Sequence, residues 1–224
     1  MITALECVPC IVRQTLEAAQ LVSDDVAFQE EVVRRTLKHL ATVSYQETPP
    51  VVAARVHAEI RRLLDVEDPY KRQKDHFNQL ALDLRPTLER EVEHADDPLE
   101  QALRFSVAGN VVDFGIHADI NEADLYRAIE HAAEVPLVGN VESFRRHAED
   151  ADRILFLADN TGEIVFDRLL IQHLPHPERV TVAVRGGPII NDATVEDAQF
   201  AGISDIVPVI SNGAVIPGTD LESC

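Results

Sequence analysis

One stretch of the sequence, residues 153–194, combines two short apolar runs with a helical segment between them. The runs 154–158 and 180–184 are bounded by polar residues, glycine or proline, which is typical of buried parallel strands. The residues between them have the spacing of one apolar helical face: Ile164, Phe166, Leu169, Leu170 and Leu174. A strand, a helix and a second strand in this order predict two parallel strands joined by a helix, and therefore an α/β fold.

Each of these two strands is followed by a polar turn. Asp159 and Asn160 leave the first strand, and Asn191 and Asp192 follow the second. Because parallel strands joined by a helix bring their following turns to the same sheet edge, where ligands bind, we expect these side chains to converge. Their carboxylate and amide oxygens suit a hard divalent cation. Such residues are also ordinary turn and capping residues, but two such turns with glycines nearby favour a metal or phosphate site.

Other residues near the same edge are candidates for binding a substrate. The turn 160–163 leads directly into a helix, so the N–H groups and the positive dipole end at Gly162 and Glu163 predict a seat for an anion. Arg185 precedes two glycines and either offers a cation to a ligand or is a solvated strand end. A third strand is expected at residues 206–210, and Ser211 follows it at the same edge.

The first two thirds of the chain have helical rather than strand periodicity. Helices are predicted at residues 11–22, 28–43, 51–64, 68–93, 97–110, 122–133 and 141–148. We therefore expect an all-helical subdomain over residues 1–150 and a Rossmann-like α/β layer with a mostly parallel sheet over residues 151–224. Three strands make a small sheet, so this layer looks incomplete, as if truncated at its C-terminus.

Two motifs lie at the ends of predicted helices. Cys7 and Cys10 form a CxxC that could be half of a zinc site, a redox pair or simple packing, and the sequence contains no second CxxC to complete a zinc site. Asn110 and Asp113 interrupt an apolar stretch, where a buried charge is costly unless it is paired or bound to a metal. The same residues could instead mark a helix end terminated by Gly115.

The charge balance excludes some classes of partner. With 39 acidic and 20 basic residues the net charge is -19, which argues against non-specific binding of nucleic acid or of anionic membranes. The same field would repel a phosphorylated substrate, and a bound divalent cation is the usual local remedy.

No apolar run approaches the roughly 20 residues of a membrane span, and no signal peptide is evident. Three cysteines are too few for a disulfide framework and predict a cytoplasmic protein. Nothing in the sequence predicts an oligomeric state.

Several motifs together resemble a known family. They are ADNTGEIVFDRLLI, VTVAVRGGPIINDAT, AGNVVDFG, DPYKRQKDHFN and ECVPCIVRQ, and in this order they are similar to the damage-control phosphatase family, in particular to its CxxC-bearing microbial stand-alone members. The resemblance covers nearly the whole chain. It implies a helical subdomain packed on a Rossmann-like α/β/α domain, a divalent cation held by Asp159, Asn160 and Asp192, and hydrolysis of phosphate monoesters of sugar phosphates or damaged phosphometabolites.

The leading hypothesis is thus a metal-dependent phosphatase that uses Mn²⁺, Mg²⁺, Co²⁺ or Ni²⁺ and acts on a small phosphorylated metabolite. Asp192 or Asp113 would orient the attacking water, and Asn110 would help to close the pocket. Family members also carry a Lys-Gly-x-x-Asn-Phe-Glu motif that this sequence lacks. The alternative is therefore a non-catalytic module, or an inactive fragment, that binds metal and a phospholigand. A nucleotide-binding Rossmann protein is disfavoured because no GxGxxG follows the first strand.

Overall fold

The computed structural model describes residues 2–111 and 122–219, which form two compact units. The first unit contains the described residues up to Arg72 together with 185–190 and 213–219, and the second contains 73–184 and 191–212. The α/β class with a parallel sheet, expected from the sequence, is confirmed. The division of the chain at residue 150 stays a prediction. Within the described ranges, no helix is both long and apolar enough to cross a membrane.

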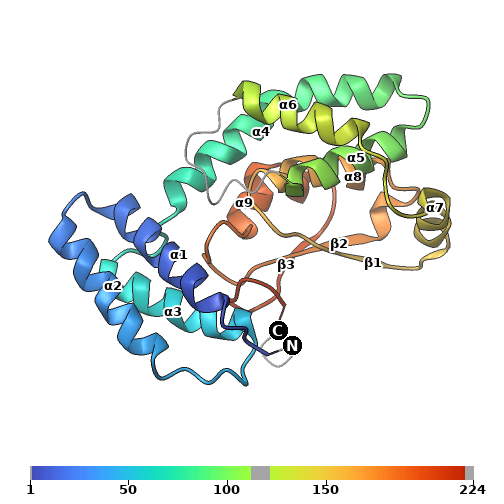
Figure 1. Cartoon of the computed structure of the whole chain (residues 1–224). Coiled ribbons are helices and arrows are strands. Elements are labelled where there is room, and N and C mark those ends of the chain that lie inside the picture. The colour runs from blue at the N-terminus through green and yellow to red at the C-terminus, as the bar shows by residue number, and fades with distance from the viewer. Residues whose placement is uncertain (1, 112–121, 220–224) are drawn as a thin grey trace. The chain divides into compact units, whose positions relative to one another are not determined.

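The first unit is built on three helices, α1 (Cys7–Val22), α2 (Val26–Leu40) and α3 (Pro49–Leu64), which pack against one another (Figure 1). The helix α2 begins where the Asp25 carboxylate accepts a hydrogen bond from the Ala27 N–H. Proline is the first residue of α3, where its missing N–H costs nothing. The apolar faces of these helices bury one core that includes Ile11, Val32 and Ile60. The helix α1 starts four residues earlier than predicted, so the CxxC forms its first turn.

The second unit starts at Gln73, within α4 (Lys71–His94), and continues with α5 (Pro98–Val111), α6 (Glu122–Glu134) and α7 (Val141–Asp150). The Asp97 carboxylate caps α5 by accepting from the Glu100 N–H, and the Asn140 side chain caps α7 by accepting from the Ser143 N–H. The helices α5 and α6 pack on each other, and side chains of α4 join the same core. All the predicted helices of residues 1–150 are therefore present, with ends shifted by a few residues.

The sheet of the second unit has three parallel strands in the order β1 (Ile154–Leu157), β2 (Val180–Val184) and β3 (Val209–Ser211). Ile154 pairs with Val180, and Val182 pairs with Val209. The helix α8 (Glu163–His173) connects β1 to β2, and α9 (Val195–Phe200) lies between β2 and β3. The third strand starts three residues later than predicted, because Ile203–Asp205 form a turn of 3₁₀ helix and delay it.

Burial in this unit differs from the sequence prediction in two ways. The helix α8 is buried nearly all round rather than on one face, because it packs closely against α5 and shares one core with β1 and β2 (Figure 1). The strand β1 is buried on one face only: Leu155 and Leu157 expose 60% and 58% of their surface. The prediction of a fully buried first strand is thus wrong for alternate residues.

Candidate functional site

The turns that follow β1 and precede α9 lie side by side. Asn160 and Asp192 face each other as an isolated antiparallel bridge. The Ala193 N–H donates to the Asp159 carbonyl at 2.7 Å, and the Thr161 N–H donates to the Asn191 carbonyl at 2.9 Å. The structure therefore brings together the four polar residues that the sequence placed at one sheet edge. Residues directly opposite in an antiparallel pair have Cβ atoms about 5 Å apart on the same side, so the side chains of Asn160 and Asp192 are neighbours.

The side chain of Asn160 contacts two carboxylates. Its Nδ2 lies 3.3 Å from Asp159 Oδ2 and 3.0 Å from Glu163 Oε2. The amide nitrogen therefore faces the acidic groups, and its oxygen is the atom that could ligate a cation. Asp192 is only 5% exposed, while Asp159 and Asn160 are partly buried. Burying a carboxylate is costly unless positive charge or hydrogen-bond donors lie nearby.

Glu163, the first residue of α8, is the centre of a second set of contacts. Its carboxylate accepts hydrogen bonds from Asn110 Nδ2 at 3.0 and 3.1 Å and from Asn160 Nδ2. Burial raises the pKa of Glu163 and the charge of Asp159 raises it further, while the hydrogen bonds from the two asparagines oppose this. Asn110 itself is exposed, near the end of α5. Asn110, which the sequence suggested would help to close the pocket, thus contacts the first residue of α8, and its role at the pocket stays a prediction.

A fully buried carboxyl group lies one helical turn further along α8. Asp167 Oδ1 accepts a hydrogen bond of 2.7 Å from the hydroxyl of Ser106 on α5. Burial raises the pKa of Asp167 well above its usual range, and the neighbouring charge of Glu163 adds to this effect. The second unit therefore gathers Asp159, Glu163 and Asp167 along one path from the turn into the core.

Three residues at the bridge between Asn160 and Asp192 are candidates for metal ligands. Asp159, Asn160 and Asp192 could supply two carboxylates and one amide oxygen, a donor set that fits a hard divalent cation such as Mn²⁺ or Mg²⁺. In the described part of the chain no three His, Cys, Asp or Glu side chains are grouped as metal ligands would be.

The remaining candidates from the sequence lie in different places. The Gly162 N–H donates to Asn78 Oδ1 at 2.8 Å, so that donor is already engaged and an anion would have to displace it. Ser211 is exposed at the end of β3. Arg185 directly follows β2, is buried, and belongs to the first unit. Asp113 lies outside the described residues.

Within the first unit, position 186 must be glycine because the backbone of Gly213 lies too close to leave room for a side chain. A Cβ atom at Gly186 would lie 2.6 Å from the carbonyl carbon of Gly213. The glycine that the sequence analysis associated with a ligand thus permits two chain segments to meet. Its N–H donates to the Ala214 carbonyl at 2.8 Å.

Sequence reasoning quoted the motif DPYKRQKDHFN but gave no role to its side chains on α4, which reach this region. Asn78, buried at 1% exposure, contacts both Gly162 and Asp197, and Lys74 lies 3.4 Å from Asp197. The available signal was a lysine and an asparagine four residues apart, on the face of α4 that also carries Phe77 and Ala81. A polar pair on a buried helical face needs partners, but the sequence does not reveal which ones.

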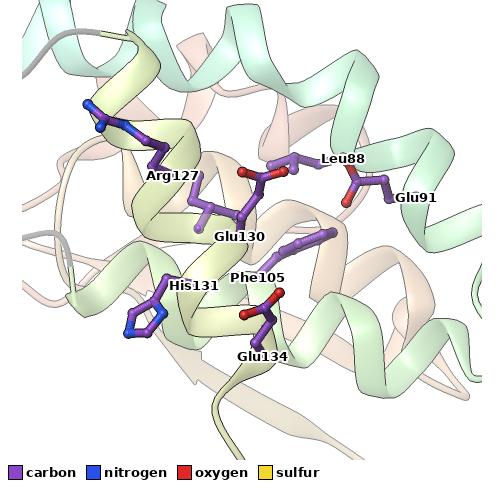
Figure 2. A pocket seen from close by; sticks show the side chains of 8 residues that line it. Leu88, Glu91, Phe105, Arg127, Glu130, His131 and Glu134 are labelled. Carbon is purple, nitrogen blue, oxygen red and sulfur yellow. The ribbon is translucent and has the colours of Figure 1, made fainter.

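The second unit also has a pocket of about 400 Å³ between α4, α5 and α6. Figure 2 shows it lined by the carboxylates Glu91, Glu130 and Glu134 around Leu88 and Phe105. The described residues that line it include none of the bridge between Asn160 and Asp192. This pocket is therefore separate from the candidate site.

Comparison with known proteins places the chain among phosphatases. A family model described as the damage-control phosphatase ARMT1-like domain matches residues 3–224. A damage-control phosphatase of Archaeoglobus fulgidus is 33% identical over 212 residues, which are 92% of this chain and 73% of that protein. An uncharacterized protein of Methanocaldococcus jannaschii, MJ0202, is 34% identical over 98% of this chain and 74% of its own length.

A solved structure is similar over the whole chain. The crystal structure of a DUF89 family protein, PH1575 of Pyrococcus horikoshii, matches with a TM-score of 0.88 at 27% identity and covers 100% of this chain and 78% of that one. The curated sequence of the same protein is named a damage-control phosphatase and is 28% identical over 97% of this chain and 75% of its own length.

Proposed function

Because the chain belongs to the damage-control phosphatase ARMT1-like family, we propose that it hydrolyses small phosphate monoesters with the help of a divalent cation. Relatives named damage-control phosphatases support a phosphatase role on damaged metabolites. The finer proposal is that the substrate is a sugar phosphate or a damaged phosphometabolite, and that the cation is Mn²⁺, Mg²⁺, Co²⁺ or Ni²⁺.

The observation that carries this proposal is the bridge between Asn160 and Asp192. It joins two turns that leave the sheet separately and sets Asn160 opposite Asp192. In the proposed site, Asp159, Asn160 and Asp192 hold the cation. When bound, a divalent cation would neutralise the phosphate charge and polarise the phosphorus–oxygen bond that breaks.

The residues of the chain have their own tasks in this proposal. Asp192, or Asp113 in the segment outside the described residues, would orient the water that attacks phosphorus. Asn110 is anchored by Glu163 and is exposed on its other side, so it can border the substrate. The net charge of -19 tends to repel phosphorylated ligands, and a bound cation is the usual local remedy. A small substrate with a single phosphate group fits this arrangement.

Hydrolysis of p-nitrophenyl phosphate after treatment with EDTA tests the function. We expect activity to return when Mn²⁺, Co²⁺, Ni²⁺ or Mg²⁺ is added. We expect Asp159→Ala to lower the activity by at least about 100-fold, because loss of a residue that only supports a metal ligand already costs up to about 100-fold and Asp159 is proposed as a ligand itself. Glu196→Gln, an exposed change on α9, is the control. Equal activity in wild type and Asp159→Ala would refute the site. Metal-dependent phosphate binding without turnover would instead favour a binding module.

A further inference from the structure

Asn78 on α4 uses both ends of its amide group in the interior of the second unit. Its Nδ2 donates to Asp197 Oδ1 at 2.9 Å, and its Oδ1 accepts from the Gly162 N–H at 2.8 Å. The side chain is 1% exposed. Because one partner is an acceptor and the other a donor, the orientation of the amide is fixed. Asn78 therefore links two segments that are 84 and 119 residues away in the sequence.

The two partners of Asn78 belong to the two turns of the candidate site. Gly162 follows Asn160 by two residues and is the cap of α8, with φ at +78°. Asp197 is part of the capping box of α9: its Oδ2 accepts from the Thr194 N–H at 2.8 Å and from the Thr194 hydroxyl at 2.7 Å. Thr194 in turn follows Asp192 by two residues. Asn78 thus joins the N-terminal cap of α8 to the capping box of α9, and each of these caps lies next to one turn of the candidate site.

Lys74, one helical turn before Asn78, supplies the charge that this arrangement needs. Its Nζ lies 3.4 Å from Asp197 Oδ2, and both side chains are almost fully buried. Burying a carboxylate is costly unless a cation and several hydrogen-bond donors surround it. Asp197 therefore has a lysine, an asparagine and Thr194 to stabilise its charge.

We propose that Asn78 is a positioning residue that holds the two turns of the site in register through Gly162 and Asp197. Its effect on the bridge between Asn160 and Asp192 is indirect, since Asn78 is not among the proposed metal ligands. Small displacements of supporting residues weaken metal binding and catalysis because ligands must be placed within about 0.5 Å. The expected effect of Asn78 on metal binding and hydrolysis rests on the proposed function. Its effect on the order of the two turns, through the hydrogen bonds to Gly162 and Asp197, does not.

The experiment compares Asn78→Asp with the charge swap Asn78→Asp/Asp197→Asn. The single change keeps an acceptor for Gly162 but sets two carboxylates against each other. In the swap, the new amide at position 197 can donate to the carboxylate at position 78, and Lys74 keeps one carboxylate nearby. We expect the single variant to exchange amide hydrogens at least about 10-fold faster at residues 159–163 and 191–197, and the swap to restore wild-type rates.

The same variants are titrated with Mn²⁺ and assayed with p-nitrophenyl phosphate. We expect Asn78→Asp to weaken Mn²⁺ binding by about 10- to 100-fold and to lower kcat more than it changes KM, and the swap to recover both. Leu88→Ala, a core change further along α4, is the control for general destabilisation. It should lower the melting temperature without a selective effect on the two turns.

Three results are decisive. Unchanged exchange in Asn78→Asp, faster exchange at only one turn, or a swap that fails to restore it would overturn the inference. If Asn78→Asp does not fold, Asn78→Ser, too short to reach both partners, is judged by the same exchange criterion. If wild type neither binds Mn²⁺ nor hydrolyses the ester while the exchange results are as expected, the proposed function fails and the positioning role of Asn78 stands.

Discussion

Asn160 and Asp192 pair as an antiparallel bridge at the end of a sheet whose strands are all parallel. The two segments run antiparallel here: the Ala193 N–H donates to the Asp159 carbonyl, and the Thr161 N–H donates to the Asn191 carbonyl. The local reversal places a carboxylate directly opposite an amide, which two parallel strand ends alone would not do. The bridge is therefore what makes a shared cation at this edge geometrically reasonable.

The first prediction concerns Asp192 itself. Asp192→Asn keeps the shape of the side chain but removes its charge, so we expect Mn²⁺ affinity to fall by at least about 100-fold. The stability measured in EDTA is the control, because it separates a loss of metal affinity from a loss of folded protein. Calorimetric titration measures the first quantity and thermal unfolding the second. Wild-type Mn²⁺ affinity in Asp192→Asn would exclude this residue from the metal site.

The convergence of the two turns was predictable because it follows from local patterns. Apolar runs predict β1 and β2, a helical spacing predicts α8, and the topology of such a unit puts both following turns at one edge. Asp159, Asn160, Asn191 and Asp192 could therefore be chosen from the sequence, and their approach is confirmed by the bridge. Their roles as ligands stay predictions.

The contacts of Asn78 and the burial of the strands could not be predicted in this way. The hydrogen bonds of Asn78 span 84 and 119 residues, and no local pattern specifies such partners. Similarly, the composition of β1 is apolar throughout, yet Leu155 and Leu157 are largely exposed. Burial depends on what packs against each face, which the strand sequence does not encode.

The second prediction tests the close packing of α5 on α8. A Cβ atom at Gly109 would lie 2.6 Å from Phe166 Cδ2 and 3.3 Å from the Glu163 Cα. Although alanine favours helices by up to about 1 kcal/mol over glycine, we expect Gly109→Ala to destabilise the protein by about 1–3 kcal/mol through overpacking. Denaturant unfolding measures the change. In a Phe166→Leu background the same substitution should cost less, and an equal cost in both backgrounds would contradict the steric explanation.

The third prediction concerns the buried carboxyl group of Asp167. Its pKa in the folded protein is raised well above 3.8 by burial, so the folded state binds more protons than the unfolded chain once the pH exceeds that value. The free energy of unfolding contributed by this group therefore falls as the pH rises. Asp167→Asn, which keeps an acceptor for Ser106, should be more stable than wild type at about pH 8, and the difference should shrink towards about pH 4.

Thermal unfolding in EDTA at several pH values measures this difference. Ser106→Ala serves as the comparison, because it removes the 2.7 Å hydrogen bond but leaves the titrating group in place. It should lower the stability and keep the pH dependence. A stability difference between wild type and Asp167→Asn that does not change with pH would show that the pKa of Asp167 is not raised in the folded protein.

The last prediction concerns His57, a buried histidine of α3 in the first unit. Burial, with a smaller effect of Arg61, lowers its pKa from 6.5 to about 4. Between these values the unfolded chain binds a proton that the folded protein does not, so stability is retained above about pH 6.5 and is lost as the pH falls towards 4. Since one pKa unit corresponds to about 1.4 kcal/mol, this group alone weakens folding by about 3 kcal/mol over that interval.

His57→Gln removes the titrating ring and keeps a donor for Gln14 Oε1, which lies 3.2 Å from His57 Nε2. We expect the variant to lose less stability than wild type between about pH 7 and pH 4, as measured by urea unfolding at each pH. His147→Gln, at an exposed position of α7, should follow the wild-type curve. A buried imidazole that stays neutral in the folded protein must make wild type lose more stability in acid than a variant without it. If His57→Gln instead follows the wild-type curve, the loss of stability in acid arises from groups other than His57.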